Sequence, residues 1–363
     1  MKKILSIALV LCMILALGVT AFADDVSVAM ITDYGDITDQ SFNQTTYEAC
    51  KAFADEKGLT FQYYKPASDS DEDRSSSIEK AIDDGFNVIV MPGYAFGKAI
   101  QDTVPEYDDV TFIALDVSEG DIGDLAKDVP ANLYCAVYQE ELCGYMAGYA
   151  AVKLGYTKLG FLGGMAVPAV VRYGYGFVQG VDAAAAELGL EGVEVKYAYG
   201  NQFYGDSDIT AYMDTWYAAG TEVVFACGGG IFTSAGEAAA KVGGKVIGVD
   251  VDQAATIDGL YGEGMTVTSA MKGLAATVNA ELSAIVDGKF EGGKVDNLGL
   301  VSDVPAENFV QIATSTQYND NFTEEDYAAL VAAMNAGDVV VSNDITAEPA
   351  VTAISVDYQG NIK

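Results

Sequence analysis

Three aspartates follow the first long apolar run of the exported chain and could carry chemistry. The run, Val26–Ile31, has the length and β-branched content of a buried strand. Asp33, Asp36 and Asp39 follow it at three-residue intervals. Loops at the carboxyl end of a strand are where open α/β sheets bind ligands. Carboxylates there can hold a metal ion that activates water, or they can accept hydrogen bonds from a ligand that is bound without reaction.

The hydrolytic alternative is a metal-dependent nucleoside hydrolase, which also opens with a strand followed by aspartates that hold calcium. Those enzymes use a tight cluster with two adjacent aspartates, and this loop has no adjacent pair. The chain has no histidine, the commonest general base and zinc ligand. We therefore interpret Asp36 and Asp39 as acids of a helix cap and first turn, and Asp33 as a ligand contact. We predict no catalytic residue, no metal site and no cofactor.

A second acidic run resembles the start of a calcium-binding loop. Asp69, Asp71 and Asp73 alternate along the sequence, but no glycine stands at the sixth position and no glutamate at the twelfth. The run is therefore interpreted as the solvated start of a helix.

The helix expected after Asp39 offers two further contacts. Phe42 falls in its first turn, where an aromatic side chain is more often part of the core than a surface on which a ligand stacks. Asn43 stands beside it, polar and close to the helix N-terminus. This neighbour favours a binding site over a purely structural role for Phe42.

A glycine triplet follows a later strand. Gly228, Gly229 and Gly230 come directly after the apolar run Val223–Ala226. Glycines let backbone N–H groups approach a ligand closely. The triplet matches neither the dinucleotide-binding fingerprint nor the triphosphate-binding loop, so the sequence gives little support for those ligands.

An acid and a lysine could form a clamp. Asp250 ends another apolar strand, so its side chain would project from the edge of a sheet, and Lys272 follows Thr268-Ser269 near the expected start of a helix. A lysine in that position is usually solvated. Placed opposite Asp250, it could instead help to hold ligand hydroxyls through charge-assisted hydrogen bonds.

Short apolar strands alternate with helical stretches in two successive sets. This pattern predicts an α/β protein with two doubly wound lobes, each built on a parallel sheet. One expected helix, 140–154, carries small residues on one face. The expected strands span residues 26–31, 61–64, 87–91, 110–115 and 133–137 in the first set, and 158–162, 193–199, 222–226, 245–249 and 266–268 in the second.

The N-terminus predicts export. Residues 1–23 have the pattern of a secretory signal peptide, with two lysines, an apolar stretch and the cleavage site Ala21-Phe22-Ala23. Leu11 is too large for the residue before a lipidated cysteine, so a lipid anchor at Cys12 is not expected. We predict a periplasmic or cell-surface-associated protein.

The charge of the chain argues against nucleic acid as a partner, and the spacing of its cysteines argues against a zinc or redox motif. The formal net charge of −34 becomes −36 without the signal peptide, because two lysines and no acids are lost. A chain this acidic is not expected to bind nucleic acid through its overall field. The remaining cysteines have no zinc or redox spacing. We expect them to be buried free thiols, at Cys50, Cys135, Cys143 and Cys227.

Three motifs together resemble the basic membrane protein family, whose members are purine nucleoside receptor lipoproteins of ABC transporters. The resemblance extends over essentially the whole exported chain. The motifs are Thr32-Asp33-x-Gly35-x-Ile37-x-Asp39-x-Ser41-Phe42-Asn43-Gln44, then Gly248-Val249-Asp250-x-Asp252-Gln253, then Thr268-Ser269-x-x-Lys272.

The resemblance implies a type I periplasmic-binding fold with two lobes joined by a three-crossover hinge. The lobes would comprise residues 24–138 plus 251–290 and residues 139–250 plus 291–363. They would close on a nucleoside, and a membrane permease would be the partner of a monomeric receptor. A sugar receptor of the same fold, the hydrolase, and a signalling or adhesion protein stay open as alternatives.

The resemblance also implies roles for the residues singled out above. Phe42 would stack on one face of the base, and Phe203, with Tyr204 in reserve, on the other. Stacking of a base on an aromatic ring contributes roughly 1–3 kcal/mol. The polar contacts implied are Asp33 and Asn43 to the base edge, Asp250 and Lys272 to the ribose, and the backbone of Gly228, Gly229 and Gly230 along the site.

Overall fold

The computed structural model describes residues 26–362, which form two compact units. Unit 1 comprises the described residues up to Tyr34, then Thr46–Ala136 and Ala275–Asp296. Unit 2 comprises Gly35–Thr45, Val137–Leu274 and the chain from Asn297 onward. The predicted signal peptide and Cys12 lie outside the described residues.

Unit 1 is built on a six-stranded sheet with the order β11-β5-β4-β3-β1-β2. Parallel pairing joins β1 to β2 and β3, β3 to β4, and β4 to β5. The five predicted strands of the first set are therefore confirmed. The strands are β1 (Ser27–Ile31), β2 (Thr60–Tyr64), β3 (Val88–Pro92), β4 (Thr111–Leu115), β5 (Leu133–Tyr138) and β11 (Lys294–Leu298).

Helices connect these strands and cover an apolar core. Ile31, Ile89 and Phe112 of the sheet pack in that core with Ile78 and Ile100 of the helices. The helices are α2 (Phe42–Lys57), α3 (Asp71–Asp83), α4 (Gly97–Thr103) and α10 (Leu274–Val286), with short 3-10 turns η1 (Tyr94–Phe96), η2 (Val104–Glu106) and η3 (Gly123–Lys127).

Unit 2 is built on a seven-stranded sheet with the order β12-β10-β9-β8-β6-β7-β13. Its neighbours are parallel except for β10 and β12. The C-terminal strand, β13, pairs with β7 at the edge of the sheet. The strands are β6 (Lys158–Gly163), β7 (Val193–Tyr199), β8 (Val223–Cys227), β9 (Lys245–Asp250), β10 (Thr266–Lys272), β12 (Val310–Ile312) and β13 (Ile354–Asn361).

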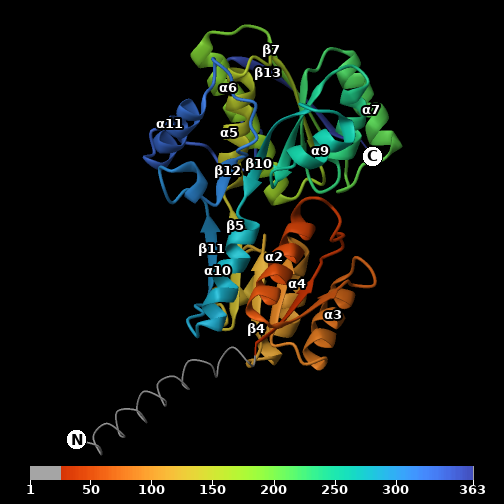
Figure 1. Cartoon of the computed structure of the whole chain (residues 1–363), viewed down its shortest axis with the longest axis vertical. Coiled ribbons are helices and arrows are strands. Elements are labelled where there is room, and N and C mark those ends of the chain that lie inside the picture. The colour runs from red at the N-terminus through yellow and green to blue at the C-terminus, as the bar shows by residue number, and fades with distance from the viewer. Residues whose placement is uncertain (1–25, 363) are drawn as a thin grey trace, which may run out of the picture. The chain divides into compact units, whose positions relative to one another are not determined.

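The two faces of this second sheet carry different helices (Figure 1). On one face, Leu162 and Val224 pack with Met213, Trp216 and other residues of α7, α8 and α9. On the other, rings of the sheet contact Phe177 and its neighbours. The helices are α5 (Glu140–Lys153), α6 (Pro168–Leu188), α7 (Ser207–Ala218), α8 (Phe232–Ala240), α9 (Ala254–Tyr261) and α11 (Glu324–Asn335), with the 3-10 turn η4 (Pro305–Glu307).

The observed division differs from the predicted lobe boundaries. Residues 251–274 were expected in the N-terminal lobe, but they belong to unit 2. The physical reason is that β10 pairs in parallel with β9 along the same sheet. The segment Gly35–Thr45 also groups with unit 2, and the chain returns to that unit at Asn297 rather than at residue 291.

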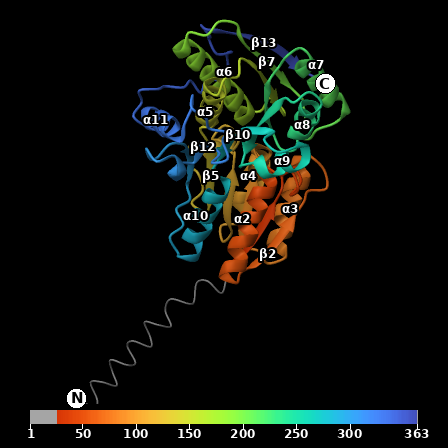
Figure 2. The ribbon, with the colours of Figure 1, turned by 45° about the horizontal axis from the view of Figure 1, so that its top comes forward.

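Helices α5 and α6 lie side by side (Figure 2), and glycines stand where their backbones approach each other. A Cβ atom at Gly148 would lie 2.3 Å from the carbonyl oxygen of Phe177, and one at Gly180 would lie 2.0 Å from that of Tyr145. These distances are shorter than non-bonded atoms tolerate, so each helix needs glycine where the other backbone crosses it. The predicted small-residue face of 140–154 is thus a helix-packing surface.

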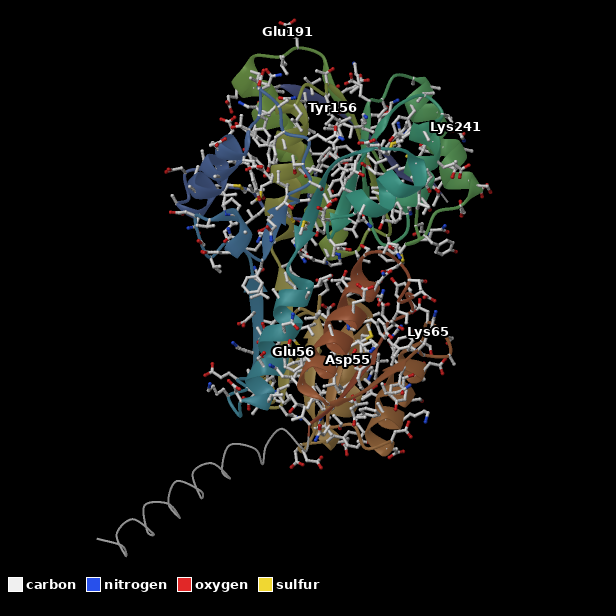
Figure 3. All side chains as sticks on the ribbon, in the orientation of Figure 1. Asp55, Glu56, Lys65, Tyr156, Glu191 and Lys241 are labelled. Atoms are coloured by element: carbon white, nitrogen blue, oxygen red, sulfur yellow. The ribbon has the colours of Figure 1, made fainter. Side chains whose placement is uncertain are left out.

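The acidic character of the chain is carried at the surface of each unit. Exposed carboxylates include Asp55, Glu56 and Glu191, and Glu191 projects from the top of the view in Figure 3. All four cysteines in residues 26–362 are buried free thiols, as predicted. Within the same residues, no helix combines the length and the apolar character needed to cross a membrane.

The glycine packing predicts a position-specific effect of added methyl groups. Gly180→Ala should lower the free energy of unfolding by about 1–3 kcal/mol, because its Cβ overlaps the backbone of α5. Gly259→Ala in α9 is the matched control, since no atom lies within 4 Å of its added Cβ. That variant should be neutral or stabilised by up to about 1 kcal/mol. Urea unfolding measures both, and equal effects would contradict the packing account.

Candidate functional site

The loop before α2 is organised by one carboxylate. Asp39 accepts hydrogen bonds from the backbone N–H groups of Ser41, Asn43 and Gln44, at 2.9, 2.9 and 3.0 Å. These are donors that the first turn of a helix leaves without intrahelical partners. Burial raises the pKa of Asp39, against the opposing effect of those N–H groups. The predicted helix-start role is confirmed for Asp39, while Asp36 stabilises the preceding turn through Thr38.

Lys272, at the end of β10, is buried at the centre of a cluster. Its Nζ atom lies 3.6 Å from a carboxylate oxygen of Asp250 and 3.6 Å from one of Glu140. It also lies 4.7 Å from the centre of the Phe42 ring, within the range of a cation–π interaction. The rings of Tyr138 and Tyr173 are 5.6 and 5.8 Å away. We refer to Phe42, Tyr138, Glu140, Tyr173, Asp250 and Lys272 as the Lys272 cluster.

Asp250 connects this cluster to the segment before α2. Ser41 Oγ donates a hydrogen bond of 2.5 Å to its Oδ2, and the Tyr173 hydroxyl lies 3.5 Å from its Oδ1. The residue ends β9 in the left-handed backbone region, with φ of 65°. That conformation is uncommon for a residue other than glycine. With this conformation, the chain leaves the sheet at Asp250, the residue whose carboxylate lies in the cluster.

Glu140 is the second carboxylate of the cluster. It opens α5, where a negative charge is favourable near the helix N-terminus, and its side chain is fully buried. Arg172 of α6 donates from Nε to its Oε2 at 2.6 Å. Sequence reasoning did not assign a site role to Glu140. The available signal was a charged residue at the start of a helix that is otherwise apolar and small.

The side chain of Asn43 has one buried atom without a hydrogen-bond partner among the described residues. Its side-chain nitrogen donates to Asp39 at 3.2 Å, whereas its buried Oδ1 accepts no hydrogen bond. A buried acceptor without a donor carries a desolvation cost of about 1–3 kcal/mol. A ligand N–H group or an ordered water molecule would remove that cost.

Phe203 and the glycine triplet form a second group within unit 2. Cβ atoms at Gly164 and Gly228 would lie 2.4 and 2.8 Å from the Phe203 ring, so both positions need glycine to admit it. Gly230 N–H donates to the Phe203 carbonyl at 2.9 Å. Gly229 takes φ of 51°. These contacts give the glycines a structural reason that is independent of any ligand, and the adjacent Tyr204 is 63% exposed.

Asp33 belongs to unit 1, at the carboxyl end of β1. Its Oδ1 accepts from the backbone N–H of Tyr34 at 2.6 Å. A Cβ atom at Gly93, which follows β3, would lie 2.5 Å from Asp33 Oδ2. Gly93 thus leaves space for the carboxylate between two parallel strands. The predicted contact of Asp33 with a ligand stays a prediction.

Comparison with known proteins identifies the family. The family model of PnrA-like ABC transporter substrate-binding proteins matches residues 26–334. The chain belongs to this family. It is also similar to two curated basic membrane proteins. The nucleoside-binding protein BmpA of Lactococcus lactis is 27% identical over 242 residues, or 63% of this chain and 65% of that protein. Basic membrane protein B of Borreliella afzelii is 27% identical over 245 residues, or 65% and 68%.

Solved structures support the fold of this PnrA-like protein. A solute-binding protein from Aeropyrum pernix is 20% identical, with a TM-score of 0.68, and covers 88% of each chain. One from Conexibacter woesei is 22% identical, also with a TM-score of 0.68, over 88% of this chain and 99% of its own. The predicted type I periplasmic-binding-like fold with parallel sheets is confirmed. At these identities the likeness concerns the fold alone.

The predicted site residues fall into two groups in the PnrA-like chain. In residues 26–362, no group of three or more histidine, cysteine, aspartate or glutamate side chains is arranged to hold a metal ion. Asp39 uses its carboxylate as a helix cap. Of the predicted site residues, Phe42, Asp250 and Lys272 are brought into one cluster, Asn43 follows Phe42 in α2, and Phe203 and the glycines form the second group.

The buried carboxyl group of Glu141 should make the stability of the fold depend on pH. It is 4% exposed, and burial is the main cause that raises its pKa from 4.5 to about 7, with a smaller contribution from the charge of Glu140. A carboxyl group whose pKa is higher in the folded than in the unfolded state stabilises the fold in full at pH values below its unfolded pKa. This contribution is lost as the pH rises through the folded pKa of about 7. Glu141→Gln should therefore raise the free energy of unfolding relative to wild type at pH 8, by roughly 2–3 kcal/mol.

The control for this effect is the wild-type protein at low pH. The difference between Glu141→Gln and wild type should shrink as the pH falls from 8 towards 4.5, because the wild-type carboxyl becomes protonated. Denaturant unfolding at each pH measures it. A difference that is constant across this range would show that the variant acts through packing and not through ionisation.

Proposed function

We propose that this PnrA-like protein is an extracytoplasmic receptor that binds a nucleoside, with a purine as the base, and delivers it to an ABC transporter permease. The observation that carries the proposal is the Lys272 cluster, in which a buried ammonium lies beside a carboxylate and against an aromatic ring. The name of the lactococcal relative supports it, because that protein is described as nucleoside-binding. Family membership supports the transport role.

The polar groups of the cluster suit the sugar of a nucleoside. The Asp250 carboxylate can accept from a hydroxyl, and the Lys272 ammonium, 3.6 Å from it, can donate to one. Two adjacent hydroxyls, as in ribose, can engage an acceptor and a donor placed side by side. Both side chains are nearly excluded from solvent, which strengthens charge-assisted hydrogen bonds.

The start of α2 suits the base. Phe42 is half-buried, so part of its ring surface remains open to a planar ligand. Asn43 Oδ1 lacks a donor, and the N–H groups on the edge of a purine are donors of the required kind. Stacking together with a few oriented polar groups is typical of small-molecule sites. No catalytic base is needed for this task.

Loss of the Phe42 ring should weaken binding. Phe42→Ala is expected to raise the Kd for inosine about tenfold or more, because stacking contributes roughly 1–3 kcal/mol. Phe290→Ala is the control, since Phe290 is also half-buried but belongs to unit 1 and not to the Lys272 cluster. Isothermal titration with inosine, guanosine, adenosine and ribose measures affinity, and thermal unfolding checks the fold. If Phe42→Ala unfolds the protein, the ring is part of the core.

Asp250→Asn separates the sugar contact from the base contact. The change is nearly isosteric, and asparagine tolerates the left-handed backbone of this position. Affinity for inosine should fall about tenfold, because a charge-assisted hydrogen bond is weakened. Affinity for the free base hypoxanthine should change little. Equal losses for both ligands would contradict the role assigned to Asp250.

The same samples address the hydrolase alternative. Inosine should be recovered intact after prolonged incubation with the protein and calcium. Release of hypoxanthine that scales with protein concentration, and that stops on chelation of calcium, would replace the receptor proposal with a metal-dependent hydrolase.

A further inference from the structure

Arg172 of α6 is connected to Lys272 through Glu140. Arg172 Nε donates to Glu140 Oε2 at 2.6 Å, and Glu140 Oε1 lies 3.6 Å from Lys272 Nζ. The Glu140 side chain is fully buried, and that of Arg172 is 18% exposed. A buried carboxylate is stable only where opposite charges compensate for its removal from water. Here two cations, one on α6 and one at the end of β10, compensate the same carboxylate.

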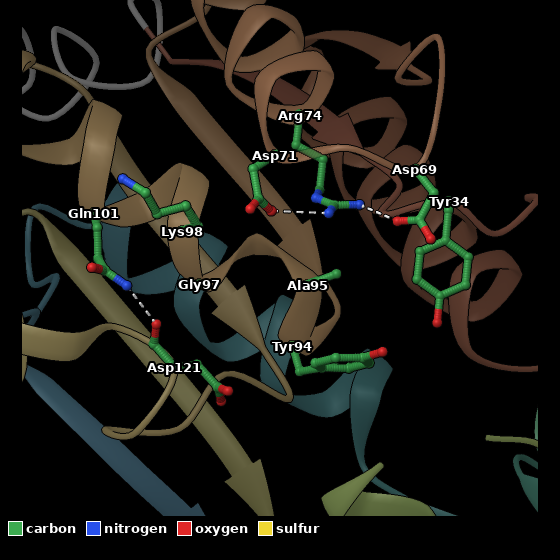
Figure 4. A pocket seen from close by; sticks show the side chains of 10 residues that line it. All are labelled: Tyr34, Asp69, Asp71, Arg74, Tyr94, Ala95, Gly97, Lys98, Gln101 and Asp121. Carbon is green, nitrogen blue, oxygen red and sulfur yellow. Dashed lines mark hydrogen bonds and ion pairs between the residues drawn. The ribbon is translucent and has the colours of Figure 1, made fainter. Parts of the chain in front are cut away.

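The other arginine of the chain is bound in a different way. Arg74 donates to Asp69 and Asp71 at 2.7 and 3.0 Å, and the three residues line a pocket of unit 1 that is shown in Figure 4. Both acids lie within five residues of Arg74, at the predicted helix start, and their side chains are 61% and 48% exposed. Arg74 thus serves its own helix, whereas Arg172 reaches a fully buried acid on a different helix, 32 residues away.

The backbones of α5 and α6 are in close contact at this pair. A Cβ atom at Gly144 would lie 2.2 Å from the Tyr173 carbonyl oxygen, and one at Gly176 would lie 2.1 Å from that of Glu141. Tyr173 and Glu141 directly follow the paired arginine and glutamate in the sequence. Helices packed this closely cannot shift toward each other, so they hold the guanidinium and the carboxylate at a fixed separation.

The next residue of α6 contacts the second acid of the cluster. The Tyr173 hydroxyl donates to Asp250 Oδ1 at 3.5 Å, and this oxygen lies 3.6 Å from Lys272 Nζ. The ammonium is therefore equally distant from two acids, and consecutive residues of one helix contact both of them. An ammonium is drawn most strongly to the less compensated of two carboxylates, so this balance depends on the partners of each acid.

We propose that Arg172 is a positioning residue for the ligand: by pairing with Glu140, it keeps the Lys272 ammonium between the two acids, where it can donate to a ligand hydroxyl. Without Arg172, the buried Glu140 carboxylate would attract the ammonium more strongly and draw it away from Asp250. Two adjacent hydroxyls need the donor and the acceptor side by side. The effect on the ligand rests on the nucleoside-binding function proposed above, and Arg172 itself makes no ligand contact in it.

The first test compares the affinities of two ligands. Arg172→Gln should raise the Kd for inosine about tenfold and change that for hypoxanthine little, because the sugar contact depends on Lys272. Arg172→Lys keeps the charge and should restore most of the inosine affinity. Lys153→Gln is the matched control, with wild-type affinity expected, because it removes another α5–α6 ion pair, 2.9 Å from Glu187, at 15% exposure. Equal losses for both ligands, or no rescue by lysine, would overturn the proposal.

The second test removes both members of the pair. Arg172→Gln alone leaves the buried Glu140 with less compensation and can unfold the protein, whereas Arg172→Gln combined with Glu140→Gln leaves no carboxylate there. If Arg172 acts through Glu140, the double variant binds inosine as tightly as Glu140→Gln alone. Losses that add in the double variant would show that the two residues act independently and would reject the positioning role.

Crystal structures without ligand separate this proposal from the nucleoside-binding function. In Arg172→Gln, Lys272 Nζ should lie within hydrogen-bond distance of Glu140 and farther from Asp250 than the 3.6 Å of the wild type. In Glu140→Gln it should move toward Asp250 instead. An ammonium that stays in place in both variants contradicts the positioning role, even if the protein binds inosine. Both movements in a protein that binds no nucleoside would uphold the positioning role and reject the nucleoside.

Discussion

The burial of the Lys272 ammonium is the constraint around which unit 2 is arranged. Removing an ammonium from water costs several kcal/mol unless opposite charges and good geometry compensate it. Asp250 and Glu140 supply two carboxylates at equal distances, and Phe42 supplies the face of a ring. Loss of either carboxylate would leave buried charge without its compensation. The backbone segments that carry these groups must therefore be placed close together.

Strand register and helix packing provide that placement. Met271 pairs with Asp250 across the parallel strands β10 and β9, so Lys272 emerges beside the acid. Glu140 belongs to α5, which approaches α6 closely. The approach requires glycine at position 176, because a Cβ atom at Gly176 would lie 2.1 Å from the Glu141 carbonyl oxygen. That approach lets Arg172 reach Glu140 at 2.6 Å. Glycines where α5 and α6 cross thus help to determine the geometry of the charged groups.

Local patterns predicted the elements well, because apolar strands and capped helices are encoded over short windows. The cap at Asp39, the strand that ends at Asp250 and the two parallel sheets all followed from such patterns. The lobe boundary at residue 250 was wrong because pairing of β10 with β9 is a long-range choice that periodicity does not reveal. Lys272 was expected near a helix start, and it instead ends β10, which extends further than the short strand predicted at 266–268.

Side-chain partners were harder to predict than elements. Ser41 donates to Asp250 across a separation of 209 residues, and the contact of Glu140 with Lys272 likewise depends on tertiary packing. The glycine triplet shows the opposite limitation. Its composition suggested a ligand surface, whereas the Phe203 ring already occupies the space beside Gly228. A glycine pattern reports a close approach, and only the folded chain shows whether a ligand or a side chain makes it.

The backbone of Asp250 shows how the strand end serves the cluster. A left-handed conformation of a non-glycine residue costs of order 1–3 kcal/mol and persists only where surrounding contacts enforce it. Here those contacts include Ser41, Tyr173 and Lys272, all directed at the carboxylate. A glycine would relieve the backbone cost but would remove the carboxylate with it. An aspartate is among the few residues that tolerate this conformation and also carry the charge that the buried ammonium requires.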